Sequence, residues 1–186
     1  MAKPKINRQR LLWVDLEMTG LDPETDKILE LGAIVTDWRM NPKGNLTLVM
    51  KQDEAFIRKR FDTAFWREHH ATAEALIAQN ATGLTPAEFE AQLIAFIQEQ
   101  FKIDQPEGNI VLAGNTIRAD RSFIDRHLPE VAKYLHYRML DVSAFKVLFE
   151  ARYKKVFAKP ENHRALEDIE GSIDELKYFM QYIKVA

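Results

Sequence analysis

Residues 11–17 read Leu-Leu-Trp-Val-Asp-Leu-Glu, an apolar run interrupted near its end by Asp15 and Glu17. A short apolar run that leads into a turn is typical of a buried strand. Side chains alternate across a strand, so Asp15 and Glu17 are expected on the same face of the sheet. Two such carboxylates repel each other and are costly to desolvate unless a cation lies beside them. The pair therefore indicates either a metal site or a solvated strand edge.

The segments that follow predict an antiparallel meander. Residues 20–23, Gly-Leu-Asp-Pro, mark a turn, after which Ile28–Trp38 is expected as a second strand. Residues 41–44, Asn-Pro-Lys-Gly, predict another turn. That turn leads into a third short strand, Leu46–Met50.

From Asp53 onward the apolar spacing is mostly helical. Thr85-Pro86-Ala87-Glu88 is a capping box with proline at the first helical position, followed by an apolar face that begins at Phe89. The remaining elements are expected in this order: strand Asn109–Ala113, helices Arg121–Leu128 and Glu130–Leu135, strand Tyr137–Leu140, and helices Ser143–Tyr153 and Ala165–Ile183. This order predicts an α/β fold, with a mixed five-stranded sheet of an antiparallel meander plus parallel strands, flanked by helices.

Length and composition narrow the class of protein. A chain of 186 residues, 46% hydrophobic, is expected to form a single domain over residues 1–186. A net charge of -2 argues against a broad basic surface that coats long nucleic acid, but leaves a small substrate possible. Without cysteine there is no disulfide or thiolate zinc site, so any metal must bind oxygen and imidazole. Residues 1–10 are basic but no purely apolar stretch follows, which predicts a cytoplasmic protein with no membrane segment.

Three further polar positions lie where a site could form. Asp120 follows a predicted strand and the loop Gly114-Asn115-Thr116, near the start of a helix. An ordinary interaction of Asp120 with the helix dipole is the alternative. Asp168 lies early in the last helix, five residues after His163, which is expected in the preceding loop or first turn. A surface histidine and an exposed acid remain the ordinary interpretations of these two residues.

Sequence motifs raise the functional interpretation above these alternatives. The matching segments are Val14-Asp15-Leu16-Glu17-Met18-Thr19-Gly20-Leu21-Asp22-Pro23, Gly114-Asn115-Thr116 with Asp120, and His163 with Asp168. They resemble the three motifs of the DEDDh exonucleases. Within that superfamily, His136-Tyr137-Arg138 and Leu140-Asp141-Val142-Ser143 make the chain most similar to the oligoribonucleases. The match is poor between Asn41 and Gly108.

The resemblance implies a ribonuclease H-like fold and a 3′-to-5′ exoribonuclease that degrades short oligoribonucleotides, especially dinucleotides, to mononucleotides. It also implies two divalent cations, Mg²⁺ or Mn²⁺, which suit oxygen ligands. In this scheme Asp15 bridges the ions, Glu17 and Asp168 bind one, and Asp120 contributes to the other. His163 is the general base, since an imidazole with a pKa of about 6.5 can accept a proton near neutral pH.

Substrate contacts are implied by the same resemblance. Leu21 is expected to wedge between the two terminal bases. A cap on the 5′ phosphate is expected from Thr116 and Ser143, together with Arg138 and Tyr137 of the partner subunit in a homodimer. Arginine suits this role because its guanidinium can hold a phosphate dianion with two hydrogen bonds. Thr116 stands where the family usually has serine, so the hydroxyl is kept while the preferred substrate length is in doubt.

Five further substrate contacts are expected on less specific grounds: Met18, Thr19, Trp66, His70 and Asn115. Tyr137 is also expected among the catalytic residues. His69 is as good a candidate as His70, because the spacing after Trp66 does not fit the family cleanly.

Two rival functions share this scaffold. Another DEDDh nuclease would use the same acids and histidine on longer RNA or DNA, and would call for an open groove and usually a more basic surface. A non-catalytic binding module could keep the acids for folding or for partner contacts. The intact set Asp15, Glu17, Asp120, His163 and Asp168 counts against that module, since a binder has no need for a general base.

Overall fold

A mixed sheet with the strand order β3-β2-β1-β4-β5 forms the centre of the fold. β1 (Arg10–Met18) pairs antiparallel with β2 (Ile28–Asp37), and β2 pairs antiparallel with β3 (Pro42–Val49). On the other side of β1, β4 (Ile110–Gly114) and β5 (Leu135–Asp141) run parallel to it. The predicted five-stranded sheet, an antiparallel meander plus parallel strands, is therefore confirmed.

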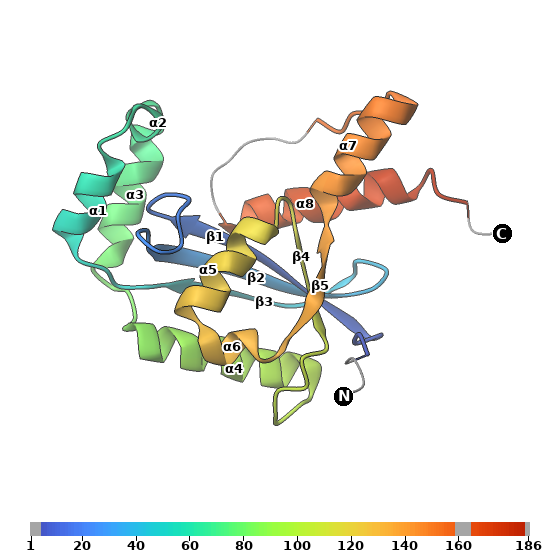
Figure 1. The fold of residues 1–186 in the computed structure, drawn as a ribbon, viewed down its shortest axis with the longest axis horizontal. Helices are drawn as coiled ribbons and strands as arrows, with labels where there is room; N and C mark the ends of the chain where they lie inside the picture. Colours follow the sequence, from blue (N-terminus) through green and yellow to red (C-terminus); the bar gives the residue numbers. More distant parts are fainter. Residues whose placement is uncertain (1–4, 159–164, 185–186) are drawn as a thin grey trace.

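Helices cover both faces of this sheet and one of its ends (Figure 1). The computed structural model describes residues 5–158 and 165–184. Its helices are α1 (Glu54–Phe61), α2 (Ala64–Glu68), α3 (His70–Asn80), α4 (Pro86–Phe101), α5 (Arg118–His127), α6 (Pro129–Ala132), α7 (Val142–Tyr153) and α8 (Ala165–Met180). Across the described residues, no helix combines the length and apolar character needed to cross a membrane.

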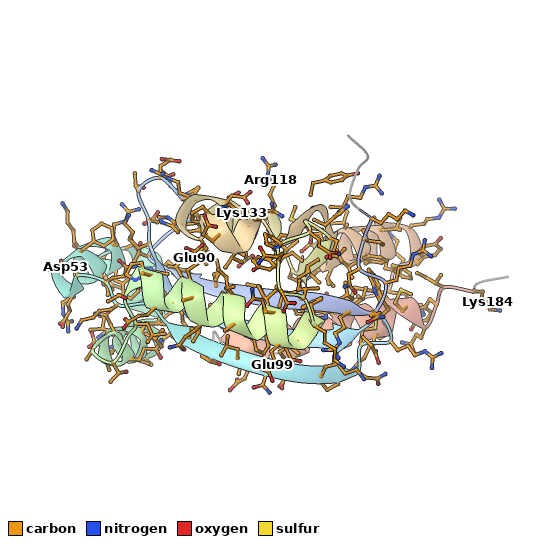
Figure 2. All side chains as sticks on the ribbon, turned by 90° about the horizontal axis from the view of Figure 1, so that it is seen from below. Asp53, Glu90, Glu99, Arg118, Lys133 and Lys184 are labelled. Atoms are coloured by element: carbon orange, nitrogen blue, oxygen red, sulfur yellow. The ribbon has the colours of Figure 1, made fainter. Side chains whose placement is uncertain are left out.

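β1 contributes side chains to two separate cores because its residues alternate across the sheet. Leu12 and Val14 belong to the core under α4, α5 and α6, whereas Leu11 and Trp13 pack in the core under α7 and α8. Figure 2 shows α4, which carries Glu90 and Glu99, lying across the first of these faces. By the same alternation Asp15 continues the Trp13 face, so the strand's acids point toward the α8 side of the sheet.

Helices α1, α2 and α3 form a third unit at one end of the sheet (Figure 1). Leu29 of β2 joins their apolar cluster, which contains Ile57 and Trp66. The pairing of β1 with β2 shifts beside Glu17, so that Leu29 is the extra residue of a bulge. Bulges redirect side chains next to active sites, and this one directs Leu29 toward α1–α3.

Local boundaries differ from the sequence prediction in the first hairpin. The predicted turn at 41–44 is wrong, because β3 already begins at Pro42. The Asp37 carboxylate accepts hydrogen bonds from the backbone N–H groups of Arg39 and Asn41. Met40 adopts a left-handed conformation with φ of 62°. An Asp side chain that bonds the backbone two residues on is a turn signal, and it places the turn before Pro42.

Boundaries of other elements also differ from the prediction by a few residues. α5 begins at Arg118, three residues before the predicted Arg121. The predicted helix from Glu130 to Leu135 ends at Ala132, since Leu135 is already in β5. The capping box of α4 is confirmed, with Thr85 and Glu88 each accepting a hydrogen bond from the other's backbone N–H.

Candidate active site

Three carboxylates converge where β1 meets the start of α8. One ligand oxygen from each of Asp15, Glu17 and Asp168 lies within 4.8 Å of the others, and all three residues are half-buried. Asp15 and Glu17 leave the same face of β1, and Asp168 is in the first turn of α8. Like charges this close favour a bound cation, and an oxygen-only donor set suits Mg²⁺ or Mn²⁺. The residues present therefore fit a divalent metal.

Gly32 on β2 lets α8 approach the sheet at this point. It pairs with Asp15 across the ladder, and a Cβ added to it would lie 2.9 Å from the carbonyl carbon and the Cβ of Ala165. Any residue with a Cβ at position 32 would push the backbone of Ala165 away from the strand. Sequence reasoning missed Gly32, although a glycine inside a buried strand often marks such a close approach.

Asp120 stands beside the cluster rather than in it. Its Oδ1 accepts a hydrogen bond from the Leu16 N–H at 3.0 Å, and the residue is only 6% exposed. Burial, together with the negative charges of Asp15 and Asp141, raises the pKa of Asp120 to about 8. A neighbouring cation would oppose this shift, because it favours the ionised carboxylate.

A second buried acid, Glu30, was not anticipated from the sequence. It pairs with Glu17 across the β1–β2 ladder and is 2% exposed. Its Oε2 accepts a hydrogen bond from Gln79 Nε2 of α3 at 2.5 Å. The signal was an acid within the apolar first part of β2, residues 28–35. Glu30 therefore joins the α1–α3 unit to the strand that faces the cluster.

A groove of about 610 Å³ adjoins the carboxylates. One wall is the end of β1 and the loop after it, and the other wall comes from α1, α2 and α3. The lining residues include Glu17, Met18, Thr19, Leu21, Arg60, Phe65, Trp66 and His69. Leu21 lines this groove, and its side chain is 82% exposed.

The two histidines after Trp66 take different positions. His69 lines the groove, whereas His70 borders a separate small pocket and lies 3.9 Å from Glu74 Oε1 through its Nε2. Of the two histidines left open by the sequence, His69 is therefore the one that lines the groove beside Glu17. Phe65, which sequence reasoning passed over, is 52% exposed in the groove, with its ring 4.5 Å from that of His69.

Thr19 and Trp66 line the groove but are largely enclosed. The Thr19 hydroxyl donates to Asp26 Oδ1 at 2.9 Å and accepts from the Lys27 N–H at 3.0 Å. The Trp66 ring stacks on Phe61 with centroids 4.0 Å apart and is 9% exposed. Both residues shape the groove wall through the contacts that hold them.

A pair of hydroxyl groups lies at the carboxyl end of β4. Thr116 Oγ1 and Ser143 Oγ are 3.1 Å apart, and the Thr116 N–H donates to Ser143 Oγ at 2.9 Å. Thr116 has a φ of 50°, an uncommon and strained conformation for a β-branched residue. The Asp141 carboxylate accepts from the N–H groups of both residues, which stabilises this conformation.

Comparisons with known proteins agree with this geometry. A family model described as exonuclease matches residues 12–176. The chain is 39% identical to an oligoribonuclease of Pseudomonas syringae, covering 95% of this chain and 97% of that protein. It is 36% identical to the mitochondrial oligoribonuclease of mouse, covering 98% of this chain and 77% of that protein.

The chain belongs to the oligoribonuclease family of exonucleases. Family membership makes it a metal-dependent 3′-to-5′ exoribonuclease, and the carboxylate cluster provides a place for the metal. The resemblance seen in the sequence motifs is thereby confirmed.

Solved structures confirm the ribonuclease H-like fold. Exonuclease I of Escherichia coli, in complex with a dA16 oligonucleotide, superposes with a TM-score of 0.64 at 15% identity, covering 93% of this chain. Exonuclease I of Methylocaldum szegediense gives a TM-score of 0.61 at 22% identity, covering 94% of this chain. The chain spans 41% of the length of each of these proteins.

Other predicted site residues lie apart from the three carboxylates, and one lies outside the described residues. Tyr137 and Arg138 are exposed on the edge strand β5, with the guanidinium carbon of Arg138 5.4 Å from the centroid of the Tyr137 ring. Asn115 points its amide toward α8, where Nδ2 donates to Ser172 Oγ. His163 lies outside the described residues.

Proposed function

We propose that this exonuclease acts on short oligoribonucleotides, above all dinucleotides, and removes mononucleotides from the 3′ end. The convergence of Asp15, Glu17 and Asp168 carries this proposal, together with a groove of about 610 Å³ that Glu17 also lines. A groove of that size suits one or two nucleotides rather than a long strand. The names of the relatives, oligoribonuclease in both bacteria and mammals, support the same substrate class.

The proposed cofactor is a pair of divalent cations, Mg²⁺ or Mn²⁺. Asp15, Glu17 and Asp168 would hold one, and Asp15 with Asp120 the other. Such ions, when bound, neutralise phosphate charge and stabilise the departing 3′ oxygen. The support from this chain is the donor chemistry, which is oxygen alone, and the raised pKa of Asp120, which a nearby cation would reverse.

The remaining roles belong to the chain's own side chains. His163 is the proposed general base, accepting a proton at an imidazole nitrogen from the attacking water. Leu21 is proposed to wedge between the two bases, which fits its 82% exposure at the groove. Thr116 and Ser143 are proposed to form the binding site for the 5′ phosphate, with His69 and Phe65 against a base.

We further propose that residues 1–186 form one exonuclease domain that works as a two-fold symmetric homodimer. In this dimer Tyr137 and Arg138 complete the partner's phosphate cap. The support is the position of β5 at the edge of the sheet, where Tyr137 is 51% exposed, next to α7, whose Val147 and Leu148 are 68% and 51% exposed. Apolar side chains exposed this far often mark an interface. A cytoplasmic location stays a prediction, since the relatives include a mitochondrial protein.

The decisive experiment is a time course on 5′-labelled RNA of two to twenty nucleotides, with Mn²⁺, with Mg²⁺ and with a chelator. Dinucleotides should disappear fastest, and the chelator should stop the reaction. Equal or faster degradation of the twenty-nucleotide RNA would favour a nuclease of longer polymers. Binding without cleavage would favour the non-catalytic module, with Asp15→Asn as the inactive reference.

A further inference from the structure

Glu175 is a buried acid with no place in the chemistry described so far. It belongs to α8, the helix that carries Asp168, and it is 1% exposed. Its Oε2 accepts a hydrogen bond from Asn115 Nδ2 at 3.0 Å. Its Oε1 lies 4.0 Å from Lys146 Nζ and accepts no hydrogen bond from the described residues. Burying a carboxylate costs free energy, so the presence of Glu175 at this position calls for a role.

The contacts of Glu175 lead to the hydroxyl pair. Asn115 Nδ2 also donates to Ser172 Oγ at 2.9 Å, and Ser172 Oγ in turn donates to the Asp168 carbonyl oxygen at 2.8 Å. On its other side, Asn115 Oδ1 accepts from Ser143 Oγ at 3.2 Å. Asn115 therefore links the metal-binding helix to the residues proposed to hold the 5′ phosphate.

The direction of these hydrogen bonds follows from the chemistry of the groups. Carboxylate oxygens accept hydrogen bonds, so the NH₂ end of the Asn115 amide faces Glu175. The carbonyl end then faces Ser143 and takes the single hydroxyl proton of that residue. Ser143 Oγ is left as an acceptor for the backbone N–H of Thr116. The hydroxyl of the pair that can turn its proton to a phosphate is then that of Thr116.

We propose that Glu175 is a positioning residue for recognition of the 5′ phosphate. Through the Asn115 amide it sets the direction of the hydrogen bonds of Ser143, and so leaves the Thr116 hydroxyl as the donor to the phosphate. Lys146 lies three residues after Ser143 on α7. Its ammonium group reduces the repulsion between the Glu175 carboxylate and an incoming phosphate dianion. This inference rests on the proposed function of the hydroxyl pair.

The test compares 5′-phosphorylated and 5′-hydroxyl dinucleotides of the same sequence, with kcat and KM measured for each in Mn²⁺. Glu175→Met removes the acceptor at similar volume and should raise KM for the phosphorylated dinucleotide about tenfold, as expected for one lost hydrogen bond to a charged group. KM for the 5′-hydroxyl dinucleotide and both kcat values should stay within about twofold, because the weakened contact acts on the 5′ phosphate alone. Glu175→Gln, which still offers an oxygen to Asn115, should retain the discrimination.

One control separates this inference from the function on which it rests. Thr116→Val removes the proposed phosphate donor, so unchanged discrimination in this variant would overturn the role of the Thr116 hydroxyl in the cap, on which the inference rests. Two outcomes would overturn the positioning role while the cap stands, provided that Thr116→Val loses discrimination. In one, Glu175→Met keeps its discrimination; in the other, Glu175→Met loses rate equally on both substrates. Should Glu175→Met fail to fold, Asn115→Ala interrupts the same path and is read by the same KM ratio.

Discussion

Gly32 of β2 lies directly under Ala165, the first described residue of α8, with no room for a Cβ between them. This contact fixes where α8 meets the sheet, and Asp168 is one turn further along the helix. The distance between Asp168 and the acids of β1 therefore depends on a residue that carries no side chain. The arrangement of the carboxylate cluster is set by backbone packing as much as by its own side chains.

Gly32→Ala should move the start of α8 away from β1 and lower kcat by at least tenfold, because small displacements of catalytic groups are costly. Affinity for Mn²⁺, measured by calorimetric titration, should fall in parallel. Gly44→Ala is a matched control, since the nearest group there is the end of the flexible Gln100 side chain. Normal activity in Gly32→Ala would contradict the link between this contact and the site.

Asp15→Ala and Asp168→Ala should each abolish hydrolysis while the protein stays folded. Removing one carboxylate from a like-charged cluster relieves repulsion, so the Tm without metal should be unchanged or higher. Glu170→Ala, at an exposed acid of the same helix, is the control for activity. Near-normal turnover in either variant would refute the metal-ligand assignment.

Asp120→Asn should stabilise the metal-free protein in a pH-dependent way. The pKa of Asp120 is raised from 3.8 to about 8 in the folded protein, so the folded state binds its proton more tightly than the unfolded state. The associated stability is fully present below pH 3.8 and is lost as the pH rises toward 8. The gain in Tm from Asp120→Asn, measured with a chelator, should therefore be small at pH 4 and largest near pH 8. A gain that does not grow with pH would contradict the raised pKa.

Asp26→Asn should destabilise the protein and loosen the loop that carries Leu21. Burial raises the pKa of Asp26, but hydrogen bonds from the Asp22 N–H, Thr19 and Arg60 outweigh it and leave the pKa below 3.8. This stability is present above pH 3.8 and is lost as the pH falls through the lowered value. We expect a loss of about 1–3 kcal/mol in the free energy of unfolding at pH 7.

The matched control for Asp26→Asn is Asp62→Asn, which removes an exposed acid paired with Arg67. It should change the free energy of unfolding by less than about 1 kcal/mol. KM for dinucleotides should rise in Asp26→Asn alone, because that side chain holds the groove loop. Equal effects of the two variants in urea unfolding and in kinetics would contradict this role.

Mixing Arg138→Ala chains with Asp15→Ala chains should restore activity. In the proposed dimer, one site of the mixed pair has intact acids from the Arg138→Ala chain and an intact arginine from its partner. Each variant alone should be weak on 5′-phosphorylated dinucleotides. An active monomer in light scattering, or no recovery despite demonstrated subunit exchange, would overturn sharing between subunits.

The sequence alone determined the features whose signals are local. The apolar run in residues 11–17 predicted the buried strand, and the period of two along a strand predicted the shared face of Asp15 and Glu17. The capping box at Thr85 predicted the start of α4, because its hydrogen bonds lie within four residues. Short motifs identified the family, since they concentrate the chemistry in few positions.

The tertiary structure decided what depends on residues distant in sequence. No local pattern reveals that Gly32 meets Ala165, that His69 rather than His70 lines the groove, or that Glu175 contacts Asn115. Each of these contacts depends on how helices dock on the sheet, and docking is set by the packing of whole faces. The raised pKa of Asp120 has the same origin, because burial and neighbouring charge exist only once the chain is folded.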